Sequence, residues 1–133
     1  SIFYTAGGAG NRGDMIAYAF HSVDGYSKVG SYTGNGSADG TFVHCGFRPA
    51  YVMMKNTDAA EHWFVLDAKR SESNLVNDTL RANTSGAENA QDMVDFTANG
   101  FKLRTTVNGG NTGTNNYIFL AFAESPFKHS NAR

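Results

Sequence analysis

Residues 99–106 read NGFKLRTT, and residues 117–123 read YIFLAFA. In the first stretch an Asn-Gly turn dipeptide is followed by alternation, with Phe101 and Leu103 separated by basic residues. Successive side chains of a strand point to opposite faces, so this pattern predicts a strand with one buried face. The second stretch is apolar on both faces, which indicates a strand in the middle of a sheet. Together the two stretches predict a fold built from β-sheet.

Short apolar runs separated by turn residues continue this pattern along most of the chain. Further strands are expected at Met15–Phe20, at its hairpin partner in GYSKVGSYTG across Asp24-Gly25, at Thr41–Cys45, at Tyr51–Asn56 and from Trp63 onward. The region 71–95 is interpreted differently. Its stretch AENAQDMVDF is compatible with one helical turn or more, although Asn and Ser favour loops here. The loop 107–116 carries few large side chains and is expected to be mobile.

Seven or more short strands without a convincing long helix predict an all-β domain. The expected architecture is an antiparallel β-sandwich of jelly-roll or lectin-like type, and a β-barrel is the alternative, since the number of strands does not separate the two. The chain of 133 residues suits one domain. We expect residues 15–133 to form this domain and the Gly-rich residues 1–14 to be a linker or lead-in from a longer protein.

Composition excludes several classes of function. The formal net charge is −1 with charges of both signs scattered, so no basic stripe for nucleic acid is predicted. No apolar run approaches the roughly 20 residues that span a bilayer, so no membrane insertion is expected. The single cysteine, Cys45, cannot form an intrachain disulfide, which fits assembly in a reducing cytoplasm. The phosphate-binding signatures are absent, and no cofactor is predicted.

The stretch NGSADG, residues 35–40, places side-chain oxygens at Asn35, Ser37 and Asp39 before a glycine, as a calcium loop does. Such a loop needs a bidentate glutamate at its twelfth position, and counting from Asn35 that position is Gly46. Only Asp39 brings a charge. Two successive turns account for the same residues, so the sequence favours a turn over a metal site.

Nucleophilic catalysis has no recognisable motif in the chain. No GxSxG elbow occurs, and His44 and Cys45 are successive strand residues that point to opposite faces. Cys45 is therefore expected to be a small buried apolar residue. A pair of facing carboxylates, as in glycosidases, stays open because the chain has twelve Asp and Glu, and its sign would be two carboxyl groups within about 10 Å in a cleft. The chain is predicted not to be an enzyme.

One group of aromatic and polar residues near turns predicts a ligand-binding surface. Aromatic faces stack on sugar rings, and Asn or Asp side chains at loop tips bond hydroxyl groups, so aromatic and polar residues near turns suggest a carbohydrate-binding surface. The candidate residues are Tyr26, Tyr32, Asn35, Asp39, His62 and Trp63. The competing interpretation places Trp63 and the tyrosines in the core, and for Trp63 it is favoured because WFVL is typical of a strand entering the core.

Three phrases resemble a domain of tailed bacteriophages, especially marine ones: GYSKVGSYTGNGSADGTFVHCGFRPAYVMMKNT, NGFKLRTT and YIFLAFAESPFKHSNAR. The resemblance covers residues 15–133. In those phages the domain occurs in tail fibre or other virion structural proteins. The resemblance carries no catalytic residues onto this chain, and it implies a virion component, assembled in the host cytoplasm, that meets the outside world.

The leading hypothesis is accordingly a receptor-binding module of a tail fibre that contacts host-surface polysaccharide. Partners would be other virion proteins and further copies of the chain, since fibre domains commonly form homotrimers, with Phe127 as a candidate anchor of the subunit interface. The second hypothesis is a purely structural module, a capsid decoration or trimerising cap, that has a broad apolar contact in place of a polar-aromatic groove. The third is a fragment of a polysaccharide depolymerase.

Overall fold

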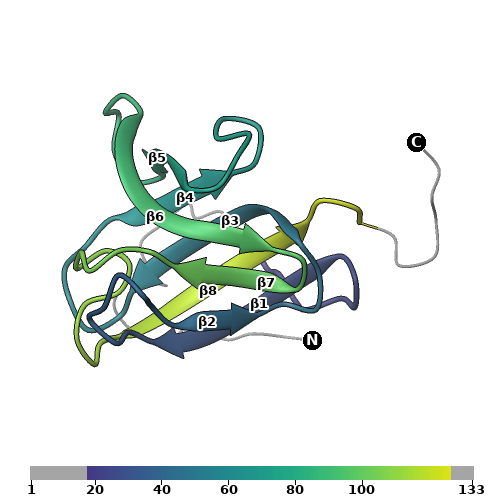
Figure 1. Ribbon diagram of the computed structural model, residues 1–133, viewed down its shortest axis with the longest axis horizontal. Coiled ribbons are helices and arrows are strands. Elements are labelled where there is room, and N and C mark those ends of the chain that lie inside the picture. Colours follow the sequence, from purple (N-terminus) through teal and green to yellow (C-terminus); the bar gives the residue numbers. More distant parts are fainter. Residues whose placement is uncertain (1–17, 127–133) are drawn as a thin grey trace, which may run out of the picture.

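The structure is a computed structural model that describes residues 18–126. Within this range the chain forms eight strands and no helix (Figure 1). The strands are β1 Ser27–Thr33, β2 Phe42–His44, β3 Pro49–Asn56, β4 Trp63–Asp67, β5 Val76–Arg81, β6 Asn89–Thr97, β7 Gly100–Leu103 and β8 Asn116–Ala123.

All strands belong to one antiparallel sheet with the order β1-β8-β3-β4-β5-β6-β7-β2. The sheet folds back on itself, so that β6, β7 and β2 face β3, β8 and β1 (Figure 1). The edge strands β1 and β2 come together at one end, where the Thr41 hydroxyl donates to the Thr33 carbonyl at 2.8 Å. The all-β prediction is confirmed. Because the sheet is continuous and nearly closes, the barrel alternative describes it more closely than two separate sheets do.

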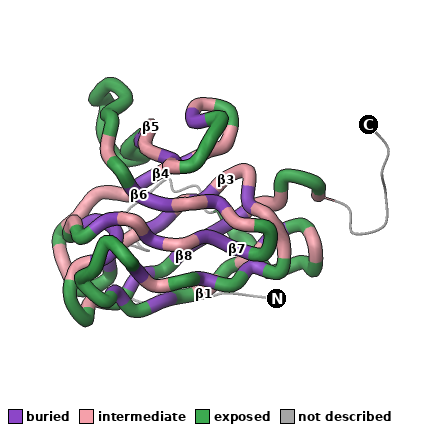
Figure 2. Tube along the Cα trace, in the orientation of Figure 1, coloured by how far each residue is buried: buried purple, intermediate pink, exposed green. Residues whose placement is uncertain are grey.

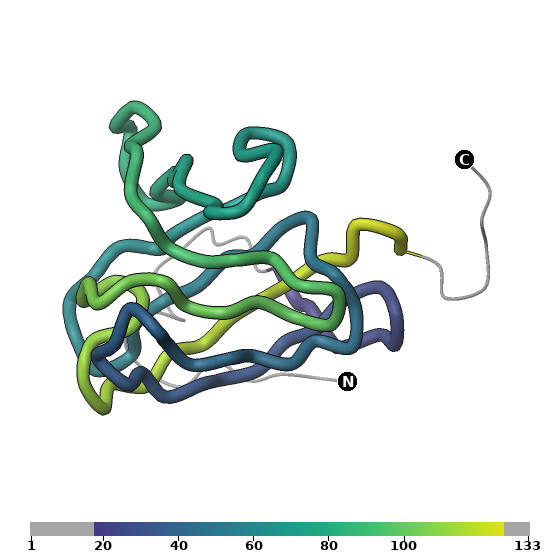
Figure 3. The backbone as a smooth tube through the Cα atoms, in the orientation of Figure 1, coloured from purple at the N-terminus to yellow at the C-terminus, as the bar shows by residue number. Residues whose placement is uncertain are grey.

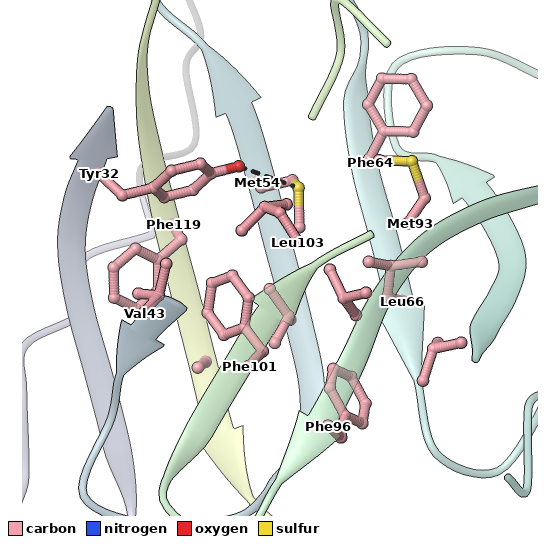
Figure 4. Close-up of a cluster of buried hydrophobic side chains, with 14 of the residues drawn as sticks. Tyr32, Val43, Met54, Phe64, Leu66, Met93, Phe96, Phe101, Leu103 and Phe119 are labelled. Carbon is pink, nitrogen blue, oxygen red and sulfur yellow. Dashed lines mark hydrogen bonds between the residues drawn. The ribbon is translucent and has the colours of Figure 1, made fainter. Parts of the chain in front are cut away.

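The core lies between the two facing halves of the sheet. Inward positions alternate with outward ones along the strands, as in β4, where buried Phe64 and Leu66 stand between half-buried residues, and Figure 2 shows this alternation along the chain. β8 departs from it, because Phe119, Leu120 and Ala121 are all buried. Phe101 of β7 packs edge-on against Phe119 of β8, with ring centroids 5.4 Å apart, so the two halves share one core (Figure 4). Tyr32 stacks on Tyr117 at 4.9 Å within the same cluster.

The predicted strands from Thr41 onward, together with the one that follows the Asp24-Gly25 turn, are present. Gly25 has a φ of 71°, and Val23 forms a bridge with Ser27 on either side of this turn. The expected strand at Met15–Phe20 is wrong for its described part, because residues 18–20 are not in a strand. The helical interpretation of 87–96 is also wrong. These residues lead into and form β6, the longest strand, which pairs with β5 and β7.

Because the strands are antiparallel, the loops that connect them lie at the two ends of the barrel. The loops 34–41, 57–62 and 104–115 share one end, which we call the Asn-rich end, and lie on the left in Figure 1. The connection 82–88 begins at this end, where Asn83 contacts His62 and Trp63. The connection between β5 and β6 stands away from the rest of the barrel (Figure 3). The opposite end holds the loops 45–48 and 68–75 and the turn before β1.

Candidate functional site

A buried asparagine anchors the loop 104–115 at the Asn-rich end. Asn111 is fully buried, and its side-chain amide donates to the Asn35 side-chain oxygen at 2.9 Å, to the Ser37 carbonyl at 2.7 Å and to the Thr105 carbonyl at 3.0 Å. Its side-chain oxygen accepts from the Asn35 backbone amide at 3.0 Å. These bonds join two loops that are more than 70 residues apart in sequence.

A second buried network holds the other side of the same loop. Asn56 is also fully buried and donates to the Asn108 carbonyl at 2.7 Å, while its side-chain oxygen accepts backbone amides of Asp58 and Ala59. The Tyr117 hydroxyl donates to the same Asn108 carbonyl at 3.0 Å. The loop expected to be mobile is therefore packed into the end of the barrel, with residues 109–111 buried.

Asn35 and Asp39 lie together in the loop between β1 and β2. The Asn35 side-chain oxygen accepts the Ser37 amide at 3.0 Å, and the Ser37 hydroxyl accepts the Asp39 amide at 3.1 Å, so these side chains build successive turns. Asp39 pairs with Lys102 and, at 3.4 Å, with Arg104. The hydrogen bond and charge of Lys102 lower the pKa of Asp39 below its usual value. The side-chain oxygens of Asn35, Ser37 and Asp39 are therefore already bonded to groups within the protein.

His62 and Trp63 lie next to each other where β4 begins, beside β3. Asn83, which sequence reasoning missed, joins them: its side-chain amide lies 3.2 Å from His62 Nδ1, and its side-chain oxygen accepts the Trp63 backbone amide at 3.1 Å. Trp63 is half-buried. The predicted core position for this tryptophan is thus only partly correct, because its neighbours Phe64 and Leu66 face the core and it faces outward.

The two tyrosine candidates have different surroundings. Tyr32 is buried, and its hydroxyl donates to the Gly110 carbonyl at 2.7 Å and contacts the Met54 sulfur at 3.4 Å (Figure 4). Burial raises the pKa of this hydroxyl well above its usual value. Tyr26 is 42% exposed but lies at the end opposite the Asn-rich loops, against Phe122. The six candidate residues therefore do not form one site, and Tyr32 belongs to the core.

Groups that could carry chemistry are few in the described part of the chain. No cluster of three or more His, Cys, Asp and Glu side chains that could hold a metal ion occurs among residues 18–126. Cys45 is buried as predicted, and burial raises the pKa of its thiol to about 11. No helix in these residues is long and apolar enough to span a membrane. Phe127, the predicted interface anchor, lies outside the described residues.

The outward side of β1, β8, β3, β4 and β5 forms an apolar surface, which we call the outer face. Strand register aligns one apolar side chain from each strand in a middle row: Val29, Leu120, Met53, Val65 and Leu80. A solvent-facing side of an antiparallel sheet normally alternates to polar residues. The other half of the barrel does so, with Asp95, Lys102 and Arg104 in ion pairs on its surface.

Two further rows flank the middle row of the outer face. The row toward the Asn-rich end is Ser31, Ile118, Lys55 and Trp63. The row toward the opposite end is Ser27, Phe122, Tyr51 and Asp67.

A hollow of about 560 Å³ opens on this face. Its strand residues are Val29, Gly30, Met53, Ile118, Phe119 and Leu120, and Trp63 lies at one side. Tyr18 and Phe20, which precede β1, complete its lining and are 79% and 52% exposed. The signal for this surface was available in the sequence, since residues 117–123 are apolar at both inward and outward positions, but outward exposure is not visible there.

Comparison with protein families gives one match, to the model of a domain of unknown function, DUF7483, over residues 1–126. Comparisons with curated proteins and with solved structures found no match. Since the family model covers nearly the whole sequence, the chain belongs to the DUF7483 family.

Proposed function

We propose that this domain is a non-enzymatic structural module of a tailed-phage virion protein, and that it works by packing its outer face against another protein subunit. The virion assignment is supported by the resemblance of the sequence to phage structural proteins. The mode of action is supported by one observation: the middle row of the outer face carries an apolar side chain on each of five strands, and the charged Lys55 and Asp67 lie only in the flanking rows. Val29, Leu80 and Ile118 of this face remain exposed, and exposed apolar side chains gathered on one face are typical of protein contacts.

The composition of the hollow favours a protein partner over a sugar. Specific recognition of sugar hydroxyls needs several converging polar groups, and the hollow is lined by aliphatic and aromatic residues. Lys55, the charged residue nearest its rim in the strand register, donates to the carbonyls of Asn56 and Ala59. The Asn and Asp side chains of the Asn-rich end are likewise bonded to one another, to backbone groups or to basic side chains.

The virion assignment is tested on purified particles of a phage that encodes this chain. Mass spectrometry of the particles should detect the protein, and its absence from them would reject the assignment. Ile118→Asp, on the outer face, should lower the number of copies per particle. Phe42→Asp changes a side chain of similar exposure on β2, 45% against 41%, and should leave that number unchanged. Equal incorporation of both variants would reject the outer face as the contact surface.

One observation favours a second function, binding of host-surface polysaccharide. Trp63 lies where the hollow meets the Asn-rich end, beside His62 and Asn83, so an aromatic surface and polar groups adjoin. Trp63 is the single tryptophan of the chain, so its fluorescence reports on this place. Titration with host polysaccharide should shift the emission, and Asn83→Ala should weaken the response. An unchanged spectrum at saturating polysaccharide would exclude this function.

A further inference from the structure

The outer face has properties that restrict what can cover it. The charged side chains in its rows are Lys55 and Asp67. Arg70 and its partner Glu88 adjoin Asp67, and Asp78, two residues from Leu80 on β5, accepts a hydrogen bond from Ser71 at 2.9 Å. Lys55 is bonded to backbone carbonyls, and Asp67 pairs with Arg70 at 2.5 Å. Lys55 therefore keeps its positive charge, whereas the charge of Asp67 is balanced by Arg70, and a partner that covers the face must not place a second positive charge over Lys55.

A second copy of the same chain meets these requirements. Each copy offers an apolar middle row, and a net charge of −1 per chain gives little long-range repulsion between copies. A face that contacts its own counterpart makes an isologous contact, which closes as a two-fold dimer. A trimer would need a second, different patch on each copy.

Charge also selects the direction of the two-fold axis. An axis along the strands would run along β3, the central strand of the five, and would place Lys55 of one copy over the partner's Lys55. An axis across the strands, along the middle row, instead places the Lys55 row over the partner's row that holds Tyr51 and Asp67. The second arrangement keeps the two Lys55 side chains apart and places each middle-row residue opposite its own copy.

The size of the face indicates how tight this contact is. Strands about 4.8 Å apart and successive outward side chains about 6.7 Å apart give an upper limit of roughly 24 by 20 Å, or about 500 Å². Phe20 of the same chain already packs on Phe122 within this area. Two faces then bury at most about 1,000 Å², the lower limit for a specific interface. A reversible dimer, formed at micromolar concentrations or above, is expected.

We infer that a second copy of this chain covers the outer face, with the two sheets antiparallel about a two-fold axis along the middle row. The inference rests on the proposed function, since it names the partner of the same surface. In a virion protein, such pairing would link neighbouring copies, and several weak contacts would act together.

Complementary charges at one position test both the partner and the arrangement. Val29 is 40% exposed in the middle row, so Val29→Lys and Val29→Asp should each fold and be monomeric by sedimentation equilibrium, whereas the wild type dimerises. An equimolar mixture of the two variants should dimerise again, because the ammonium group introduced in one chain would face the carboxylate introduced in the other. Phe42→Lys, on β2, is the matched control and should dimerise like the wild type. Far-UV circular dichroism checks that every variant is folded.

Three results would overturn the inference. A wild-type chain that stays monomeric up to millimolar concentration excludes self-association. Dimers that survive in Val29→Lys place the contact elsewhere. Monomeric variants that do not associate when mixed exclude the antiparallel arrangement. If the chain is found in virions but is monomeric, the inference fails while the proposed function stands. If it dimerises but is absent from virions, the virion assignment fails and the dimer stands.

Discussion

At the scale of single residues, this domain depends on asparagines that are wholly removed from water. Buried polar groups are tolerated when every donor and acceptor is satisfied, and Asn111 and Asn56 satisfy theirs with backbone groups of several loops. Each therefore ties together segments that are distant in sequence. Replacement of such a group leaves its partners unpaired as well, which costs more than the bond itself contributes.

Asn111→Asp should lower the free energy of unfolding by about 2–4 kcal/mol, because a carboxylate cannot donate to the three oxygens that Asn111 contacts. Urea unfolding followed by circular dichroism measures the change. Asn115→Asp in the same loop is the control. That side chain is only half-buried and has one long hydrogen bond, to Asn108 at 3.4 Å, so its effect should stay below about 0.5 kcal/mol. Equal effects would contradict the assigned role of Asn111.

Asp67 should make stability depend on pH. Burial alone would raise its pKa, but hydrogen bonds from Arg70 and from the Lys69 amide together lower it. A carboxyl group with a lowered pKa in the folded state stabilises the fold above its unfolded pKa of about 4, and this contribution is lost as pH falls through the folded value. Asp67→Asn should therefore be less stable than the wild type at pH 7.

The difference between wild type and Asp67→Asn should shrink as pH falls below about 4, as measured by urea unfolding between pH 7 and pH 3. Glu72→Gln, at an exposed position nearby, is the control and should leave the pH profile of the wild type unchanged. A difference that is constant over this pH range would show that Asp67 acts through packing and not through its charge.

At the scale of elements, glycines allow the loop 104–115 to lie against the strands. A Cβ at Gly109 would lie 2.1 Å from the ring of Phe64 on β4, so any side chain there displaces a core residue. The loop and the sheet are thus packed as one unit, which explains why a Gly- and Asn-rich segment is buried.

Gly109→Ala should destabilise the domain by about 1–3 kcal/mol through overpacking. Gly86→Ala in the exposed connection between β5 and β6 places its Cβ 3.6 Å from the nearest atom and should change stability by less than about 0.5 kcal/mol. Thermal unfolding of the two variants compares them directly. If Gly109→Ala were as stable as Gly86→Ala, the loop would not be packed against Phe64 as described.

Most strands could be predicted from the sequence because alternation and turn dipeptides are local signals. β5 and β6 could not, since VNDTLR and NAQDMVDFT are rich in Asn and Asp, which are depleted in strands, and their pairing with each other and with neighbouring strands outweighs that propensity. The candidate site was predicted by residue type alone. Tyr32 and Trp63 are both aromatic residues in strands, and only the strand register shows that the first faces the core and the second faces outward.

At the scale of the whole molecule, the two halves of the barrel share one core. Tyr32 of β1 and Phe119 of β8 meet Phe101 of β7 from the opposite half. A single core predicts that the halves unfold together. The outer face, in contrast, lies outside this core, and its Val29, Leu80 and Ile118 remain partly exposed.

Unfolding in urea should accordingly be one transition. Trp63 fluorescence reports on the half that contains β4, and far-UV circular dichroism reports on the entire sheet, so the two midpoints should coincide when measured at a concentration at which the protein is monomeric. An earlier transition in one signal would show that a part of the sheet unfolds independently.

The position of β8 has a consequence for how the molecule is made. This strand is the last of the eight to leave the ribosome, yet it lies between β1 and β3 and pairs with both along almost their full lengths. Until β8 is synthesised, the edges of β1 and β3 that pair with it have no partner strand, and each can pair with a strand of another chain. A chain that ends before residue 116 would leave both strand edges unpaired. Incomplete translation products are therefore expected to aggregate instead of forming a smaller barrel.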